Sequence, residues 1–429
     1  MKEDFLHYLW KFKKFDLLKA KTTTGENIEI LNVGQHNDLA GPDFFNARLN
    51  INGQLWAGNV EIHLKSSDWY AHNHEQDTSY DNVILHVVWE DDVAVYGVGN
   101  RALPTLNLKD YVQPKHLSSY IKLFEGQKNQ FINCENDFKS VDIYLLDNWL
   151  ERLYFERLER KVSEIEVMLK ESANDWESVL FSMLARNFGT RINGASFTEL
   201  ADRIPFSVVR KVSRSFKLEA LLLGFANILP QENFDKQSLD WKMDYEFLKA
   251  KFNLKSGLDQ SIQFFKLRPV NFPTIRLSQL ARLYEQEEQL FQKLIAFTTK
   301  EEFYDLFNVQ ASGYWETHYS FGKVHDKKVK KLTKSFIDLL LINTIIPIKF
   351  AYAKYRHLDI EDELLELITS LNSEKNSITD HFDKLRPLGK NAMNSQALIQ
   401  LKNEYCDKNK CLKCAVGSFL ISNPTTIKG

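Results

Sequence analysis

The spacing of apolar residues changes near residue 140, and no other feature restricts the fold as strongly. Between residues 28 and 98, apolar residues alternate with polar ones, as in 44–51, or form a short continuous run, as in NVILHVVW at 82–89. Alternation is typical of a strand with one buried face, and such a run is typical of a buried strand. Beyond residue 140, leucine and isoleucine recur at helical spacing. We therefore expect an α/β or α+β region followed by a mainly helical one.

The N-terminal pattern predicts the element order helix, three strands, helix, strand. The first helix is expected over 3–14, and the Asn52-Gly53 pair predicts a hairpin between strands at 44–51 and 55–65. The first strand is expected at 28–33, the polar segment 66–81 is expected to contain the second helix, and 93–98 is expected beside the apolar strand. Further helices are predicted at 176–188, 217–229, 276–297, 333–346, 361–371 and 393–405.

These patterns suggest a division of the chain into three parts. Residues 1–115 are expected to form the α/β domain, 116–139 a linker, and 140–429 a helical domain that carries a C-terminal cysteine cluster.

Two carboxylates interrupt the strand pattern of the first domain. Asp43 follows Gly41-Pro42 at the start of one strand, and Glu61 lies on the next strand across the hairpin. Two such strands can hold both carboxylates on one sheet face, and paired carboxylates suit Mg²⁺ or Mn²⁺. The simpler interpretation is that Asp43 caps a turn. Glu61 is harder to explain structurally, because glutamate is depleted in strands.

Further polar residues surround this pair. His63 and Lys65 share the strand face of Glu61 and are candidates to orient or deprotonate a water, although His63 could equally be a cross-strand partner. His72 and His74 follow and are candidates for substrate phosphate contact or for holding the second helix. His-x-His followed by Asp77 departs from a zinc-hydrolase motif in its spacing, so a zinc hydrolase is only a third alternative.

The run from Pro42-Asp43 to Glu61-Ile62-His63 resembles the PD-(D/E)XK phosphodiesterase motif. The predicted element order is also that of the superfamily. The resemblance implies that Asp43 and Glu61 are metal ligands and catalytic residues. The lysine of the motif is replaced by His63, for which Lys65 is a candidate substitute. Degenerate members of the superfamily are often inactive, so this departure leaves activity open.

Nearly the whole chain also resembles a bacterial family described as domain of unknown function 2851. The resemblance is carried by GPDF at 41–44, GNVEIH at 58–63, SSDW at 66–69, His72 with His74, NVILHVVW at 82–89, RPVNFPTIRL at 268–277 and the tail 395–414. This family implies a bacterial source and no particular activity.

The four cysteines form a second candidate site. Cys406, Cys411 and Cys414 are spaced C-x4-C-x2-C, and Cys134 is the remaining cysteine of the chain. Four thiolates suit zinc or an iron–sulfur cluster, and the interleaved lysines favour thiolate; the alternative is four free buried thiols. Some PD-(D/E)XK nucleases hold a cluster with three neighbouring cysteines and one distant one. Here the lone cysteine follows the catalytic motif, which departs from that order.

Charge and hydropathy narrow the partners and the compartment. The formal net charge is −2, so a nucleic-acid site would need a local basic patch. No run approaches the ~20 apolar residues of a membrane span, and 1–16 lacks the apolar core of a signal peptide. We therefore expect a cytoplasmic protein without membrane contact, while its protein partners stay unknown.

Together these features favour a metal-dependent nuclease acting on DNA or RNA. Asp43 and Glu61 would bind Mg²⁺ or Mn²⁺, and His63 with Lys65 would act on the water. The alternative is a catalytically inactive nucleic-acid-binding or scaffold protein that keeps the nuclease fold.

Overall fold

Asn52 and Gly53 turn the chain between strands β3 (Phe44–Ile51) and β4 (Gln54–Lys65), as the sequence predicts. Both residues have positive φ, 50° and 85°, which the tight two-residue turn requires and which asparagine and glycine tolerate best. The resulting hairpin pairs Ile51 with Gln54 and runs back to the pair Phe44–Val60. This register determines where Asp43 and Glu61 lie.

The computed structural model describes residues 1–37, 39–124, 130–232, 235–255, 258–259 and 261–423. The chain divides into two compact units. Unit 1 contains residues 1–149, 381–386 and 399–429, and unit 2 contains residues 150–380 and 387–398. The C-terminal segment with three of the cysteines thus belongs to unit 1, and 116–139 contains helix α3 (Pro114–Phe124) over much of its first half.

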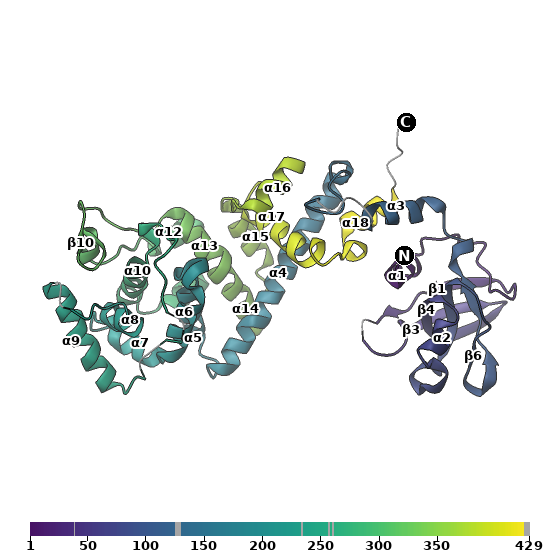
Figure 1. Cartoon of the computed structure of the whole chain (residues 1–429), viewed down its shortest axis with the longest axis horizontal. Helices are drawn as coiled ribbons and strands as arrows, with labels where there is room; N and C mark the ends of the chain where they lie inside the picture. The colour runs from purple at the N-terminus through teal and green to yellow at the C-terminus, as the bar shows by residue number, and fades with distance from the viewer. Residues whose placement is uncertain (38, 125–129, 233–234, 256–257, 260, 424–429) are drawn as a thin grey trace. The chain divides into compact units, whose positions relative to one another are not determined.

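A mixed six-stranded sheet forms the centre of unit 1 (Figure 1). Its order is β1-β3-β4-β5-β8, with β2 paired to β3; β4 is parallel to β5 and β5 is parallel to β8, whereas the other pairs are antiparallel. The remaining strands of the sheet are β1 (Ile28–Asn32), β2 (Gln35–His36), β5 (Val83–Glu90) and β8 (Thr105–Asn107).

The neighbour of β5 differs from the expected one. We expected 93–98 beside β5, but β8 occupies that position, while β6 (Tyr96–Gly97) and β7 (Arg101–Ala102) form a separate two-stranded hairpin. A return loop that reverses direction twice allows β8 to lie parallel to β5. The segment 66–81 forms only a short helix, α2 (Asp68–Ala71), followed by 3-10 turns at His74–Gln76 and Thr78–Tyr80.

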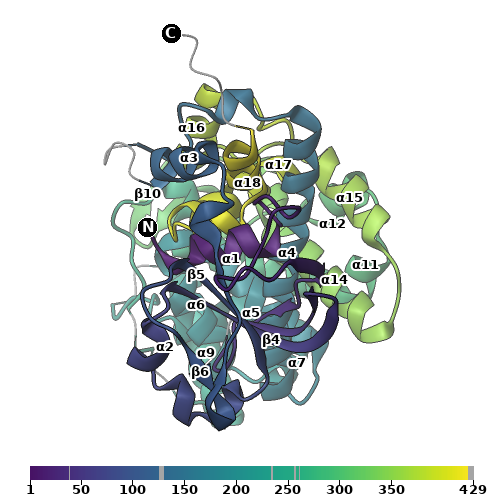
Figure 2. The ribbon, with the colours of Figure 1, turned by 90° about the vertical axis from the view of Figure 1, so that its right-hand side faces the viewer.

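Helix α1 (Glu3–Lys11) covers one face of the sheet, and a helix from the other end of the chain packs beside it. Helix α1 packs on β4, and α18 (Ala415–Ser422) packs on α3, as Figures 1 and 2 show. The Tyr8 hydroxyl lies 3.3 Å from the Ser418 carbonyl oxygen, and His116 Nδ1 lies 3.0 Å from the carbonyl oxygen of Ile421. The core between them buries Phe5, Val60 and Leu85 completely. The C-terminal segment is therefore part of the packing that supports α1.

Unit 2 is almost entirely helical, which confirms the mainly helical character expected beyond residue 140. Its helices are α4 (Ile143–Glu171, whose first turns lie in unit 1), α5 (Trp176–Phe188), α6 (Thr190–Arg203), α7 (Phe206–Ser213), α8 (Leu218–Phe225), α9 (Lys236–Lys251), α10 (Pro273–Gln286), α11 (Leu290–Ala296), α12 (Lys300–Leu306), α13 (Lys334–Leu340), α14 (Ile346–Arg356), α15 (Glu361–Ser370), the start of α16 (Ser377–Leu385, which continues into unit 1) and most of α17 (Ala392–Gln400). A small hairpin, β9 (His318–Ser320) and β10 (Lys323–Val324), interrupts them. The protein is thus α+β, with an N-terminal mixed sheet and a mostly helical remainder.

One helical stretch of unit 2 corrects an expectation about membrane spans. Residues 334–356 form a continuous helix through a π-helical turn at Leu341–Ile345, and it is long and apolar enough to cross a membrane by length and composition. Within its most apolar window, 83% of the residues are buried inside the protein, as in a core helix. Such a helix is weak evidence for a membrane span.

Candidate functional site

Asp43 and Glu61 face each other across the β3–β4 hairpin. Because Phe44 pairs with Val60, the preceding Asp43 lies opposite Glu61. The Asp43 backbone N–H donates to Glu61 Oε2 at 3.1 Å, and the Ile62 N–H donates to Asp43 Oδ2 at 2.9 Å. The structure therefore brings the two predicted carboxylates together on adjacent strands and fixes both by main-chain donors.

A bulge in β3 lies directly beside this pair. The β3–β4 register shifts between Phe44 and Ala47, and Asn46 has a φ of 57°. Its backbone N–H donates to the side chain of Asn59 at 3.3 Å. Bulges often change the direction of a strand next to a functional site. Here the bulge lies between the regular part of the β3–β4 hairpin and the start of β3, which Asp43 precedes.

Three histidines converge on Glu61. His63 Nε2 and His74 Nε2 each lie 3.4 Å from Glu61 Oε1, and His72 Nδ1 lies 3.2 Å from His63 Nε2. The ligand nitrogens of the three rings all lie within 4.8 Å of one another. His63 is buried, His74 is half-buried and His72 is exposed, so the cluster runs from the protein interior to its surface.

Neighbouring side chains hold these rings in place. His63 Nδ1 lies 2.9 Å from Nε2 of His86, a fully buried residue on β5, as expected for a hydrogen-bonded core histidine. His74 stacks on Tyr80 with 3.8 Å between ring centroids, and Trp69 meets His74 edge-on. The rings are thus oriented before any ligand binds.

Burial controls the ionisation of the cluster. Burial, with the charges of His74 and His72, lowers the pKa of His63 to about 3, so this ring is neutral at neutral pH. Burial raises the pKa of the Glu61 carboxyl, a hydrogen bond with His74 opposes this effect, and the charge of Asp43 adds to it. A divalent cation beside the neutral His63 ring would favour the charged form of Glu61, which burial disfavours.

Helix α1 contributes residues that the sequence pattern did not single out. His7 Nε2 lies 3.3 Å from Asp43 Oδ2, and His7 Nδ1 lies 3.5 Å from His36 Nε2. Burial lowers the pKa of His7, but the hydrogen bond and charge of Asp43 outweigh it and raise the pKa overall. Burial and the charge of Asp43 raise the pKa of Glu3 one turn earlier. The sequence did contain a signal for these residues: Glu3 and His7 are four residues apart and therefore share the polar face of the first helix.

Lys65 lies outside this cluster. It is exposed at the end of β4, and its backbone N–H donates to Asp68 Oδ2 at 2.9 Å. Within the described part of the chain, no ion pair joins its ammonium to Asp43 or Glu61. The exposed position gives Lys65 no defined role in orienting a water.

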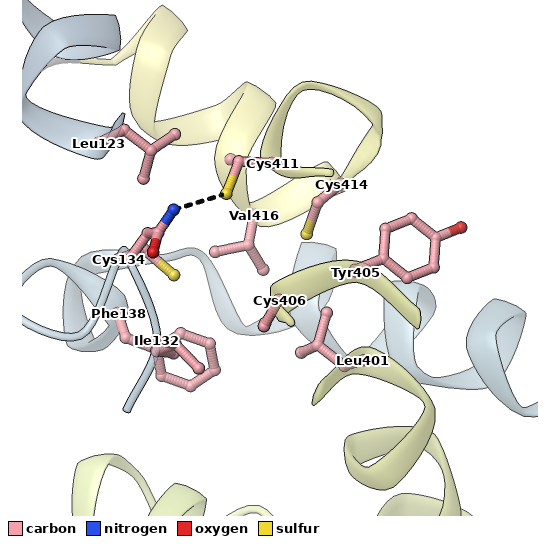
Figure 3. A pocket seen from close by; sticks show the side chains of 12 residues that line it. Leu123, Ile132, Cys134, Phe138, Leu401, Tyr405, Cys406, Cys411, Cys414 and Val416 are labelled. Carbon is pink, nitrogen blue, oxygen red and sulfur yellow. Dashed lines mark hydrogen bonds between the residues drawn. The ribbon is translucent and has the colours of Figure 1, made fainter. Parts of the chain in front are cut away.

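The four cysteines line a single pocket of unit 1 (Figure 3). Cys134 reaches it from the loop after α3, and the other three reach it from the C-terminal segment. The structure therefore brings together the residues of each predicted cluster: the carboxylates and histidines on the sheet, and separately the cysteines beside α18.

Comparison with known proteins identifies a family and no characterised relative. The model of a family described as "Protein of unknown function (DUF2851)" matches residues 3–377. The match includes the carboxylate–histidine cluster and Cys134 and ends before Cys406. No curated protein and no solved structure matches the chain.

Proposed function

The chain belongs to the DUF2851 family, and we propose that it is a divalent-metal-dependent phosphodiesterase acting on nucleic acid. The observation that carries the proposal is the convergence of Glu61, His63 and His74 beside Asp43. Carboxylates and imidazoles at this spacing form a set of metal donors.

Three contacts within the cluster have separations close to those between ligands of one ion. Four ligands about 2.0–2.1 Å from a tetrahedral ion lie about 3.3–3.4 Å from one another. The measured separations are 3.4 Å for His63–Glu61 and His74–Glu61 and 3.2 Å for His72–His63. Because imidazole nitrogens dominate the set, Mn²⁺ suits it better than Mg²⁺, which prefers oxygen ligands and bound waters. A divalent ion here would polarise a phosphoryl oxygen and lower the pKa of a water.

The residues of the cluster would divide the remaining tasks according to their exposure. Glu61 and His63 are almost fully buried, with side chains 6% and 2% exposed, and would hold the ion. Asp43 is 21% exposed, and its carboxylate would accept the proton of the attacking water. His72 lies at the surface and would contact either the ion or a substrate phosphate.

The substrate class rests on the resemblance to the PD-(D/E)XK phosphodiesterases. Asp43 opens one strand, Glu61-Ile62-His63 lies on the next, and a parallel strand follows after a helical crossover. The arrangement supports a nuclease-like core. His63 at the position of the lysine and the exposed Lys65 favour a second candidate, a nucleic-acid-binding or scaffold protein that keeps this core without cleavage.

A cleavage assay separates the two candidates. Purified protein is incubated with end-labelled single- and double-stranded DNA and RNA, with Mn²⁺, Mg²⁺ or a chelator. The first proposal predicts Mn²⁺-dependent cleavage that Asp43→Asn and Glu61→Gln abolish. The matched control is Glu29→Gln, which changes an exposed glutamate on β1 of the same sheet.

Two results would contradict the first proposal. Binding without cleavage under every metal condition would support the inactive alternative. Cleavage that survives in both carboxylate variants would mean that the activity lies elsewhere.

A further inference from the structure

All four cysteines of the chain meet around one space, although they come from separate segments. Cys406 ends the π-helical turn Leu401–Cys406, Cys411 begins the 3-10 turn Cys411–Lys413, and Cys414 is the N-cap of α18. Cys134 lies opposite them in the loop between α3 and α4. Figure 3 shows the four side chains around the same cavity. Independent buried thiols give no reason for such a convergence.

The rest of the cavity wall is mostly apolar and offers no competing ligand. Its other lining residues are Leu123, Ile132, Asn133, Phe138, Leu401, Tyr405, Val416 and Gly417. Burial raises the pKa of all four thiols. A bound group with its own affinity for sulfur explains why all four thiols face the same apolar pocket better than four free thiols do.

Several N–H groups point at the sulfurs. Asn133 Nδ2 lies 3.6 Å from Cys411 Sγ, the dashed contact of Figure 3. The backbone N–H groups of Val416 and Gly417, in the first turn of α18, act on the Cys414 sulfur and oppose the effect of its burial on the pKa. Donors of this kind stabilise a thiolate more than a thiol, as does a helix N-terminus.

Gly417 allows this approach. A Cβ at this position would lie 2.1 Å from the Cys411 carbonyl oxygen. The first turn of α18 therefore packs directly against the turn that carries Cys411, which only glycine permits. The backbone brings Cys411 and Cys414 to the same side of the cavity.

The spacing of the sulfurs distinguishes a cluster from a single ion. A zinc ion with four bonds of about 2.3 Å would hold its sulfurs about 3.8 Å apart. Among the residues that the structure describes, only His63, His72 and His74 form a group of three with donor atoms all within 4.8 Å of one another. No three cysteine sulfurs meet that limit, so the site is wider than a mononuclear zinc site.

We propose that Cys134, Cys406, Cys411 and Cys414 ligate an iron–sulfur cluster. Four cysteine thiolates are the standard ligand set for such clusters. In a four-iron cluster each cysteine binds a different iron, and in a two-iron cluster two cysteines bind each iron. Binding requires that each cysteine lose its thiol proton to the solvent. The charge of Lys402 favours the Cys406 thiolate, whereas Asp407, its ion-pair partner, opposes it.

The cluster would fasten the C-terminal segment to unit 1. Helix α18 contacts Tyr8 of α1 and His116 of α3. Helix α1 in turn carries His7, which contacts Asp43. A role in stability therefore follows from the position of the cluster, independently of whether the protein cleaves nucleic acid.

The test is a measurement of iron and acid-labile sulfide on the full chain purified without oxygen, together with its visible absorption and Mössbauer spectra. We expect a brown protein with equal amounts of iron and sulfide, about four of each per chain for a cubane and about two for the smaller cluster. Cys134→Ser and Cys411→Ser should each lose most of the iron. Tyr405→Phe, which changes a lining residue without a ligand sulfur, should retain it.

If the serine variants misfold, native mass spectrometry of the unmodified chain still measures the mass of any bound group. A mass increase equal to the cluster supports the proposal. One zinc per chain without sulfide would overturn it. Protein that binds neither metal after anaerobic reconstitution, with four thiols that react with alkylating reagent, would also overturn it.

Discussion

His63 illustrates at the scale of one residue how the sheet prepares the proposed metal site. Its Nδ1 contacts His86, and its Nε2 faces Glu61 and His72. Burial holds the pKa of His86 well below its usual range, so His86 is neutral. Because the contact with neutral His86 occupies Nδ1 of His63, Nε2 is the nitrogen left to bind a cation.

We expect His86→Leu to weaken Mn²⁺ binding by about 10–100-fold without loss of the fold. The leucine removes the partner of His63 Nδ1 while it keeps an apolar side chain on the buried strand β5. Titration calorimetry measures the affinity, and circular dichroism checks the fold. His86→Gln, which can still reach His63, should recover part of the affinity. Equal affinities in His86→Leu and the unmodified protein would contradict this positioning role.

Glu219 of unit 2 predicts a pH dependence of stability. Its Oε1 accepts hydrogen bonds from Trp315 Nε1 at 2.6 Å and Ser312 Oγ at 3.0 Å. Burial nevertheless raises its pKa above the ordinary 4.5, so the folded state holds the proton more tightly than the unfolded state. Its contribution is therefore complete below pH 4.5 and is lost as the pH rises through the raised folded-state value.

Glu219→Gln should remove this dependence, because the amide keeps an acceptor oxygen and carries no charge. We expect the Tm of the variant, relative to the unmodified protein, to rise as the pH increases from 4.5 to neutrality. Thermal unfolding at several pH values measures the difference. A constant difference across this range would show that the pKa of Glu219 is not raised in the folded protein.

Some of these residues could be recognised from the sequence and others could not. Strand alternation placed Glu61 and His63 on one face, and the Asn52-Gly53 turn placed Asp43 opposite Glu61. The ring position of His74 depends on packing against Tyr80 and Trp69, which no local pattern encodes. The sequence therefore predicted His72 and His74 near the site and suggested them as metal ligands only in its third alternative, the zinc hydrolase.

At the scale of elements, the parallel pairing of β4 and β5 supports the cluster, because it places Glu61 beside His86. Gly58 permits this pairing. A Cβ at Gly58 would lie 2.5 Å from both the Asn82 carbonyl oxygen and the Ile84 side chain. The strands can approach each other here only without a side chain at position 58.

Gly58→Ala should therefore destabilise unit 1 by about 1–3 kcal/mol and weaken Mn²⁺ binding. Gly97→Ala is the matched control, because a Cβ there would meet nothing within 4 Å. Chemical unfolding and metal titration of both variants test the prediction. Similar behaviour of the two variants would indicate that β4 and β5 tolerate the added methyl group.

The apolar periodicity predicted which segments are helices or strands better than it predicted which strands pair with each other. Helices α5 and α15 lie almost where the spacing predicts them. The partner of β5, by contrast, is β8, a strand of three residues that carries too little alternation to be recognised. Pairing between distant strands depends on tertiary contacts that local patterns do not contain.

At the scale of the whole molecule, the chain returns to its first unit at its end. Residues 399–429 belong to unit 1, although the helical pattern favoured one continuous domain from residue 140. Apolar periodicity predicts the helix at 393–405, but it does not predict which core the segment after it joins. The shared cavity of Cys134 and Cys406 was the long-range contact that the sequence did suggest.

Deletion of the chain after residue 398 should destabilise unit 1 more than unit 2. It removes α18 and the contacts of Tyr8 and His116 with that helix. Hydrogen exchange should then show faster exchange of α1 and α3, with little change in α5 and α10 of unit 2. Unchanged protection of α1 would mean that the C-terminal segment does not support the first unit.

Anomalous diffraction from crystals soaked in Mn²⁺ tests the central claim most directly, because it locates the ion itself. The account predicts one strong peak between Glu61 Oε1, His63 Nε2 and His74 Nε2, about 2.0–2.3 Å from each, and no such peak in Glu61→Gln crystals. Diffraction without a peak at this cluster, or with manganese bound only at other positions, would contradict it.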